Sequence, residues 1–385
     1  MNILLLSDFF YFFYTSLVSH LNEKGIKSSI CIASFGNSKK YNEEVAFLQL
    51  PEYGTYTSNL NKATILKYIK ENDINVILFP QISDVEDLIK EVKNINKSIA
   101  CLFLLHNRPD LVVADKRERF KRLHLKDVRS LKTFLAWGIP QFYLFIIAKQ
   151  WQSWAIRQYN AFDKIVVLSP SYISEYEKVM GKKDIQSKIV AIPNPKIEYV
   201  SKISIHDKKK QIVFVGRLAG EKAVYRLLQI WEKIYRQLSD WKLVIVGDGE
   251  TREENENLTK FLGLENVEFL GSQKSIPIID ESSILCLTSN IEGQPTVFME
   301  AMTLGVVPIG FDSFSAIYEM IDNGMNGIII PAFDLNQYAE ALRQLAFDSE
   351  RRFCLAMNAQ TKVRQFDMSV VSEMWVHLFK ELKLL

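Results

Sequence analysis

The sequence predicts an α/β protein of two domains, each built on a parallel sheet. Short apolar runs alternate with stretches of helical periodicity, which is typical of parallel strands covered by helices on both faces. The alternation occurs twice, on either side of Pro193-Asn194-Pro195, and 385 residues are too many for one ordinary core. We therefore expect two Rossmann-like domains, with ligands bound at the carboxyl ends of the strands in a central cleft between the domains.

The predicted strands fall into two series. The first series is residues 3–6, 28–33, 76–79, 100–105, 165–168 and 189–192. The second is residues 212–215, 243–246, 267–270, 284–287, 306–311 and 328–330. A polar stretch over 196–210 is the expected linker. This gives an N-terminal domain over 1–197, a second domain over 198–365, and an amphipathic C-terminal helix over 366–385.

Composition is that of a soluble globular protein, with 48% hydrophobic and 24% charged residues. A net charge of +2 argues neither for nor against nucleic acid overall, and we predict no nucleic-acid partner. The four cysteines have no zinc spacing and are expected to be reduced core thiols. No apolar run reaches the ~18–20 residues that span a bilayer, and the first residues lack the charged region of a signal peptide. The expected location is the cytoplasm.

Residues 289–301, with the sequence SNIEGQPTVFMEA, are the most informative for function. They follow an apolar run that we interpret as a buried strand. Pro295 suits the first position of a helix, which Leu304 and Gly305 would end. Glu292 would then lie in the loop before the helix, and Glu300 within the helix.

The start of this helix is a candidate anion site. Backbone N–H groups of Gln294, Thr296 and Val297 would point at a bound anion, favoured by the helix dipole. Two glutamates eight residues apart also occur by chance, and a helical glutamate is usually a solvated residue. Here, however, Glu300 stands among apolar neighbours, and Glu292 and Glu300 would flank the anion site. Two carboxylates that each hold a pair of hydroxyls around a phosphate pocket fit a nucleotide-sugar.

Residues 216–222, with the sequence GRLAGEK, follow the predicted strand 212–215 and precede a helical pattern over 223–238. Arg217 offers a planar fork and Lys222 a mobile point charge, and both geometries suit a diphosphate. The alternative is a solvated basic loop.

Both segments resemble the retaining family 4 glycosyltransferases, which have the GT-B fold. Residues 289–301 resemble the E-x7-E motif of that family, and GRLAGEK resembles its G-R-L-x-x-E-K signature. The triplet Gly247-Asp248-Gly249, which alone predicts only a turn, follows in the same order. The resemblance implies that a C-terminal helix crosses back to the N-terminal domain.

The resemblance also implies roles for individual residues. Glu292 would contact the transferred sugar, Glu300 the ribose hydroxyls, and Arg217 and Lys222 the diphosphate. The remaining donor-binding residues would be Gly216, Gly293, Thr296 and Val297.

His106 follows the predicted strand 100–105 directly, at the end where ligands bind in such sheets. It resembles the family's strand-terminal histidine, which contacts the donor sugar, although a lone histidine is more often structural. The family's glycine-rich loop after the first strand is replaced here by residues 8–15, which contain no glycine. Their aromatic side chains could stack on an acceptor ring or pack into the core.

A basic stretch over 116–132 leads into an aromatic and aliphatic stretch over 134–147. This pattern suits an anionic membrane surface, or a solvated helix followed by a core helix, and the sequence favours neither. The basic stretch contains eight cationic residues: Lys116, Arg117, Arg119, Lys121, Arg122, Lys126, Arg129 and Lys132.

We therefore predict a metal-independent, hexosyltransferase-type enzyme that transfers a sugar with retention of configuration. Its catalytic residues would be Glu292, His106, Arg217 and Lys222. The default donor is a UDP-sugar, and the acceptor would be a glycan, such as a lipid-linked capsule, O-antigen or lipopolysaccharide precursor. No cofactor and no metal are expected, because two cations can replace a metal at the diphosphate. The alternatives are a sugar-nucleotide epimerase of the same architecture and a non-catalytic protein that binds glycan or lipid.

Overall fold

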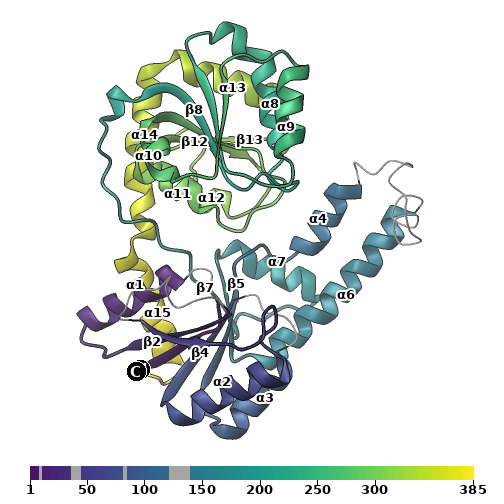
Figure 1. Cartoon of the computed structure of the whole chain (residues 1–385), viewed down its shortest axis with the longest axis vertical. Coiled ribbons are helices and arrows are strands. Elements are labelled where there is room, and N and C mark those ends of the chain that lie inside the picture. The colour runs from purple at the N-terminus through teal and green to yellow at the C-terminus, as the bar shows by residue number, and fades with distance from the viewer. Residues whose placement is uncertain (8–10, 36–44, 81–84, 121–138) are drawn as a thin grey trace. The chain divides into compact units, whose positions relative to one another are not determined.

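The computed structural model describes residues 1–7, 11–35, 45–80, 85–120 and 139–385 (Figure 1). The chain forms two compact units. Unit 1 comprises Met1–Val113, His124–Pro195 and Met368–Leu385, and unit 2 comprises Ala114–Leu123 and Lys196–Asp367.

Unit 1 is built on a seven-stranded parallel sheet in the order β3-β2-β1-β4-β5-β6-β7. Its strands are β1 (Asn2–Leu5), β2 (Ser29–Ser34), β3 (Ala46–Gln49), β4 (Ile74–Pro80), β5 (Ala100–Leu105), β6 (Lys164–Val167) and β7 (Ile189–Ala191). Its helices are α1 (Tyr11–Glu23), α2 (Asn59–Glu71), α3 (Glu86–Ile95), α6 (Pro140–Ala161), α7 (Ser171–Met180) and α15 (Met368–Glu381). Helix α4 (Leu111–Phe120) runs from unit 1 into the segment assigned to unit 2.

Unit 2 is built on a six-stranded parallel sheet in the order β10-β9-β8-β11-β12-β13. Its strands are β8 (Lys209–Val215), β9 (Lys242–Val246), β10 (Val267–Gly271), β11 (Ser282–Leu287), β12 (Val307–Phe311) and β13 (Ile328–Ile330). Its α-helices are α8 (Val224–Ile234), α9 (Arg252–Phe261), α10 (Ser275–Glu281), α11 (Thr296–Thr303), α12 (Ile317–Met320), α13 (Leu335–Phe347) and α14 (Ser349–Lys362). Short 3-10 turns lie at Ile205–Asp207, Tyr235–Gln237 and Val363–Phe366.

The predicted fold class is confirmed, because both sheets are parallel and each predicted strand is present. The strand that the sequence did not predict is β3, at the edge of the unit 1 sheet. It has only four residues, and none of them is fully buried. Its apolar run, Val45 to Leu48, is only four residues long, which is too short to distinguish a strand from other structure by pattern alone.

The C-terminal helix α15 packs within unit 1 on α1, as the resemblance implied. The rings of Tyr14 and Trp375 meet edge to face, with centroids 5.9 Å apart. Trp375 and Phe379 are buried in the same apolar core as Ile3 and Leu5 of β1. The amphipathic tail thus completes the core of unit 1.

The stretch expected to be a linker, 196–210, is fixed to unit 2. The buried carboxylate of Asp280 accepts hydrogen bonds from the Ser201 hydroxyl and from the backbone N–H of Lys202, the latter at 3.0 Å. It also pairs with the Lys208 ammonium at 3.4 Å, and both side chains of this pair are almost fully buried. Burial lowers the pKa of Lys208, and the Asp280 charge opposes that shift. The segment therefore belongs to the packed body of unit 2.

Candidate functional site

The loops that leave the carboxyl edge of the unit 2 sheet are joined to one another by their backbones. Gly216, after β8, donates to the carbonyl of Val246 at 3.0 Å. Gly247, after β9, donates to the carbonyl of Gly271 at 2.8 Å, and Leu218 donates to that of Asp248 at 2.8 Å. The loops after β8 and β9 and the last residue of β10 therefore form one connected rim.

The glycines of the Gly-Asp-Gly triplet make this rim possible. A Cβ atom on Gly247 would lie 1.9 Å from the carbonyl oxygen of Gly216. One on Gly249 would lie 2.4 Å from the carbonyl oxygen of Leu218. The triplet is thus a point of close backbone approach between neighbouring loops, in addition to the turn that the sequence predicts.

Two predicted site residues meet at this edge. The Lys222 ammonium donates to the Glu292 carboxylate, with 2.7 Å between Nζ and Oε1. The Glu292 side chain is only 8% exposed, whereas Lys222 is about a quarter exposed. The loops that carry them follow β8 and β11, which are neighbours in the sheet. The pairing of these two strands brings together residues 70 positions apart in the chain.

The loop that carries Glu292 is held by residues that the sequence analysis did not identify. Asn290 donates its backbone N–H to the carbonyl of Glu221 at 2.7 Å and its amide to that of Gly220 at 3.2 Å. The buried guanidinium of Arg226 donates to the Asn290 side chain. It also lies over the ring of Phe333, 4.1 Å from the centroid. These contacts fix the two loops of the site against each other.

Arg217 has a different environment from Lys222. Its side chain is 68% exposed and pairs with Glu221, four residues later in the same loop. The Glu221 backbone carbonyl in turn receives the Asn290 N–H described above. Arg217 is therefore attached to the same rim but has a guanidinium largely open to solvent.

Helix α11 begins one residue later than the sequence predicts. Pro295 is its N-cap, with φ −67° and ψ 106°, and Thr296 is the first helical residue. The predicted end is confirmed, since Leu304 is the C-cap and Gly305 follows with a φ of +68°. Proline at the N-cap is compatible with its fixed φ, and its carbonyl accepts from Phe298 at 3.0 Å.

Side chains at the start of α11 are partly or fully buried. Thr296, Val297 and Glu300 are half-buried, and Gly293 is buried in the preceding loop. Burial raises the pKa of Glu300, while a hydrogen bond with the Thr296 side chain acts in the opposite direction. Glu300 is thus a partly desolvated carboxylate on the first turns of the helix, and not a solvated surface residue.

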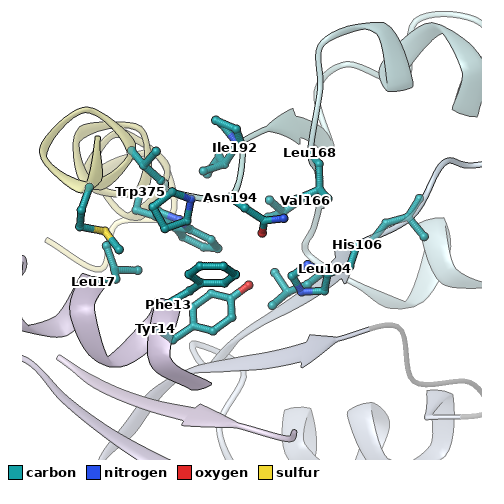
Figure 2. A pocket seen from close by; sticks show the side chains of 15 residues that line it. Phe13, Tyr14, Leu17, Leu104, His106, Val166, Leu168, Ile192, Asn194 and Trp375 are labelled. Carbon is teal, nitrogen blue, oxygen red and sulfur yellow. The ribbon is translucent and has the colours of Figure 1, made fainter. Parts of the chain in front are cut away.

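His106 lies at the carboxyl end of β5 in unit 1, beside a small cavity (Figure 2). The cavity encloses about 20 Å³, enough for about one water molecule. Both ring nitrogens of His106 are buried, and burial lowers its pKa to about 4. The imidazole is therefore neutral at pH 7. Residues from α1, β5, β6, α15 and the turn after β7 line the cavity, among them Phe13, Tyr14, Leu104, Val166, Asn194 and Trp375.

Two of the predicted segments lie partly outside the described residues. Residues 8–10 of the glycine-free loop are not described. In the first turn of α1, Phe13 and Tyr14 are buried and Phe12 is half exposed. For Phe13 and Tyr14 the structure favours the core interpretation. Residues 121–138 are also not described, and they include most of the basic stretch over 116–132 and the start of the aromatic one over 134–147.

Metal-ligand clusters and membrane spans were searched within the described ranges. There, no three side chains of His, Cys, Asp or Glu gather closely enough to hold a metal ion. In the same part of the chain, no helix combines the length and the apolarity needed to cross a membrane. Cys31, Cys101 and Cys286 are free buried thiols, as expected, whereas Cys354 is exposed on α14 and is not a core residue.

Known proteins resemble this chain in sequence. Residues 195–362 match the family model described as glycosyl transferases group 1. An alpha-1,4-N-acetyl-D-galactosaminyltransferase of Campylobacter jejuni, named for a PP-undecaprenol-linked glycan, is 28% identical over 61% of this chain and 65% of its own length. The lipopolysaccharide 1,6-galactosyltransferase of Salmonella typhimurium is 31% identical over 36% of this chain and 38% of its own length. The chain thus spans less than two thirds of either relative.

A solved structure shares the fold. HepE of Anabaena in complex with UDP-glucose superposes with a TM-score of 0.71 over 99% of this chain and 100% of that one. The two sequences are 15% identical. The GT-B fold is therefore common to both proteins.

Proposed function

We propose that this chain transfers a sugar from a nucleotide diphosphate to a glycan and retains the anomeric configuration, because residues 195–362 match the family model of glycosyl transferases group 1. The observation that supports the proposal best is the Lys222–Glu292 pair at the carboxyl edge of the unit 2 sheet. A cation and a nearly buried carboxylate are held together there, and the carboxylate stands four positions before α11 begins. They are suited to a phosphate and to sugar hydroxyls, respectively.

The leaving diphosphate gains negative charge as the glycosidic bond breaks. Lys222, the exposed Arg217 and the N-terminal end of α11 would stabilise that charge. Backbone groups of Gly216, Gly293, Thr296 and Val297 would approach the phosphates in the same region. When the donor binds, Lys222 would exchange its carboxylate partner for a phosphate.

The carboxylates and the histidine would hold the sugar and the ribose. Once Lys222 binds a phosphate, Glu292 would accept hydrogen bonds from hydroxyls of the transferred sugar. Glu300, half-buried on α11, would bind the ribose hydroxyls. His106 is neutral at pH 7, so it would act on the donor sugar through hydrogen bonding and not through charge.

The relatives indicate the classes of donor and acceptor. HepE was solved with UDP-glucose, and the Campylobacter and Salmonella enzymes are named for a PP-undecaprenol-linked glycan and for lipopolysaccharide. By analogy, the donor here would be a UDP-sugar and the acceptor a lipid-linked precursor of a capsule, O-antigen or lipopolysaccharide. We place the reaction in the cytoplasm, at the inner face of the cytoplasmic membrane.

An exposed apolar face at the start of α6 supports a membrane-surface location. Phe142 and Phe145 are 55% and 58% exposed, and Ile139, just before the helix, is similarly exposed. Tyr143 and Ile147 are buried, so this end of the helix has one apolar face that is buried and another that is exposed. In the sequence, Lys132, the last cation of the basic stretch, stands seven residues before Ile139. Cations next to exposed aromatic rings suit anionic headgroups.

A donor screen tests the proposed function. The full chain is incubated with UDP-glucose, UDP-galactose and their N-acetylated analogues, together with undecaprenyl-diphosphate-linked glycans, and UDP release is measured. We expect release that depends on acceptor and gives a product with the donor's anomeric configuration by NMR. A new nucleotide-sugar formed from donor alone would identify an epimerase. Donor binding without turnover would identify a non-catalytic protein.

Metal dependence is tested in the same assay. With two cations and a helix terminus at the phosphates, we expect transfer to continue in excess EDTA. Activity that EDTA abolishes and Mg²⁺ or Mn²⁺ restores would contradict a metal-independent mechanism.

A further inference from the structure

Three aromatic side chains gather at the carboxyl edge of the unit 1 sheet, and we name Phe35, Tyr53 and Tyr56 the aromatic platform. Phe35 follows β2 directly, and both tyrosines lie between β3 and α2. The ring centroid of Phe35 lies 4.5 Å from that of Tyr56 and 5.7 Å from that of Tyr53. Because β2 and β3 are parallel neighbours, Phe35 and the loop after β3 begin at the same edge of the sheet.

This edge is where ligands bind in open parallel sheets. The Tyr53 side chain is 89% exposed, whereas Phe35 and Tyr56 are half-buried. Tyr53 is therefore a large ring presented to solvent, in contact with the ring of Phe35, which in turn contacts Tyr56. A lone exposed aromatic residue is common on protein surfaces, but a supported cluster at a ligand edge is not explained by packing.

Hydrogen bonds from a side chain of α2 hold the loop that carries Tyr53. The fully buried Asn61 of α2 donates its amide to the carbonyls of Glu52 at 2.7 Å and Thr55 at 2.5 Å. It also accepts the backbone N–H of Glu52 at 2.9 Å. Ser58 caps the first turn of α2. These bonds fix the backbone on both sides of Tyr53, so little order has to be gained when a ligand binds.

Polar groups of the kind that bind hydroxyls surround the rings. The hydroxyls of Thr55 and Thr57 lie 3.1 Å apart and are exposed or half-exposed, and Glu52 is exposed. A sugar ring has an apolar C–H face, whose hydrogens are attracted to the negative face of an aromatic ring, and a rim of hydroxyls. The carboxylate of Glu52 suits hydroxyl donors and would repel an anionic lipid.

We propose that the aromatic platform is a subsite for a sugar ring of the acceptor glycan, with Tyr53 stacking on the ring. The inference rests on the proposed function, because it identifies where the acceptor of that reaction is held. The platform binds a neutral pyranose by its C–H face, and Glu52 and the two threonines bind its hydroxyls. It contributes to acceptor binding and not to the transfer step.

Saturation-transfer NMR tests the platform with defined probes. The full chain is mixed with the methyl glycosides of glucose, galactose, N-acetylglucosamine and N-acetylgalactosamine, with and without UDP. We expect saturation of the ring C–H protons of at least one glycoside, unchanged by UDP. Tyr53→Ala should lower that signal about three- to tenfold, and Tyr53→Trp should retain it, because the interaction needs an aromatic face.

The matched control is Phe261→Ala, since Phe261 is 86% exposed on α9 of unit 2 and has no role in the platform. It should leave the glycoside signal unchanged. A wild-type protein that saturates no glycoside, or equal signals for wild type and Tyr53→Ala, would overturn the proposal. So would a dimer that Tyr53→Ala converts to a monomer without any glycoside signal, which would identify a protein contact.

Saturation of UDP itself, recorded in the same samples, separates this inference from the proposed function. If UDP does not bind to the wild type, the proposed function fails whatever the glycosides do. If UDP binds equally to wild type and Tyr53→Ala while the glycosides bind to neither, only the platform fails.

Discussion

The carboxyl edges of the two sheets differ in chemistry, although both belong to parallel sheets of the same kind. At the edge of unit 2, charged side chains are paired in Lys222–Glu292, which is mostly buried, and in Arg217–Glu221, whose guanidinium is largely exposed. At the edge of unit 1, the described residues include the aromatic Tyr14 and Tyr53, a neutral His106 and the ion pair Arg108–Asp110. A diphosphate is recognised by charge and a neutral sugar by shape and ring stacking. The difference fits the proposed donor edge in unit 2 and the proposed acceptor edge in unit 1.

The largest expected effect is a loss of stability when the buried Lys208–Asp280 ion pair of unit 2 is broken. Asp280→Ala leaves the buried Lys208 ammonium without its carboxylate, which costs about 3–5 kcal/mol of unfolding free energy for a buried ion pair. Urea denaturation measures the cost. The matched control is Asp240→Ala, because Asp240 pairs with Lys210 on an exposed surface, and its midpoint should hardly change. Equal effects of the two substitutions would show that the linker segment is not fixed through Asp280.

Lys222→Ala should lower the transfer rate by about 10²–10³-fold, because it removes a preorganised charge at the leaving group. It should also lower the melting temperature of the free protein, since the nearly buried Glu292 loses its ion pair with Lys222. Arg217→Ala should lower the rate without that loss of stability, because Arg217 is largely exposed. Initial rates of UDP release and thermal unfolding by circular dichroism give both quantities. Near-normal rates in both variants would contradict a role of Lys222 and Arg217 in stabilising the leaving diphosphate.

The pH dependence of stability should reveal that His106 of unit 1 is neutral, in contrast to the charged side chains at the edge of unit 2. His106 has a folded-state pKa of about 4, below the ordinary 6.5, so the unfolded chain takes up its proton first. Stability from His106 is therefore complete above pH 6.5 and is lost as the pH falls towards 4. The His106→Gln protein should lack this component of the acid dependence. An NMR titration that places the His106 midpoint near 6.5 would contradict a buried neutral imidazole.

A smaller effect is expected at the membrane surface. Replacing Phe142 and Phe145 by serine should reduce sedimentation with anionic liposomes severalfold, because two exposed rings no longer insert at the headgroup level. Transfer to a water-soluble acceptor should stay unchanged. Phe261→Ser and Phe347→Ser, at exposed positions of unit 2, serve as controls. If the protein with both replacements in α6 sediments like the two controls and the wild type, α6 does not contact lipid.

The fold was predictable because its strands are buried on both faces and form continuous apolar runs, as in β5 and β11. Lys222 and Glu292 were identifiable because they stand in short motifs next to such strands. Asn290 and Arg226 were not, since their contact joins positions 64 apart and Arg226 resembles any solvated cation on a helix. The aromatic platform was also missed, because its loop has no periodicity and its support, Asn61, is revealed only by burial.

The central claim is that the carboxyl edge of unit 2 binds a diphosphate through Lys222. Isothermal titration calorimetry with UDP and with uridine, on wild type and Lys222→Ala, tests it directly. A charge-assisted hydrogen bond to phosphate contributes about 1.5–3 kcal/mol, so the preference of the wild type for UDP over uridine should fall by about 10- to 150-fold in the variant. Uridine itself should bind equally to both proteins. The same preference for UDP in both would contradict the account.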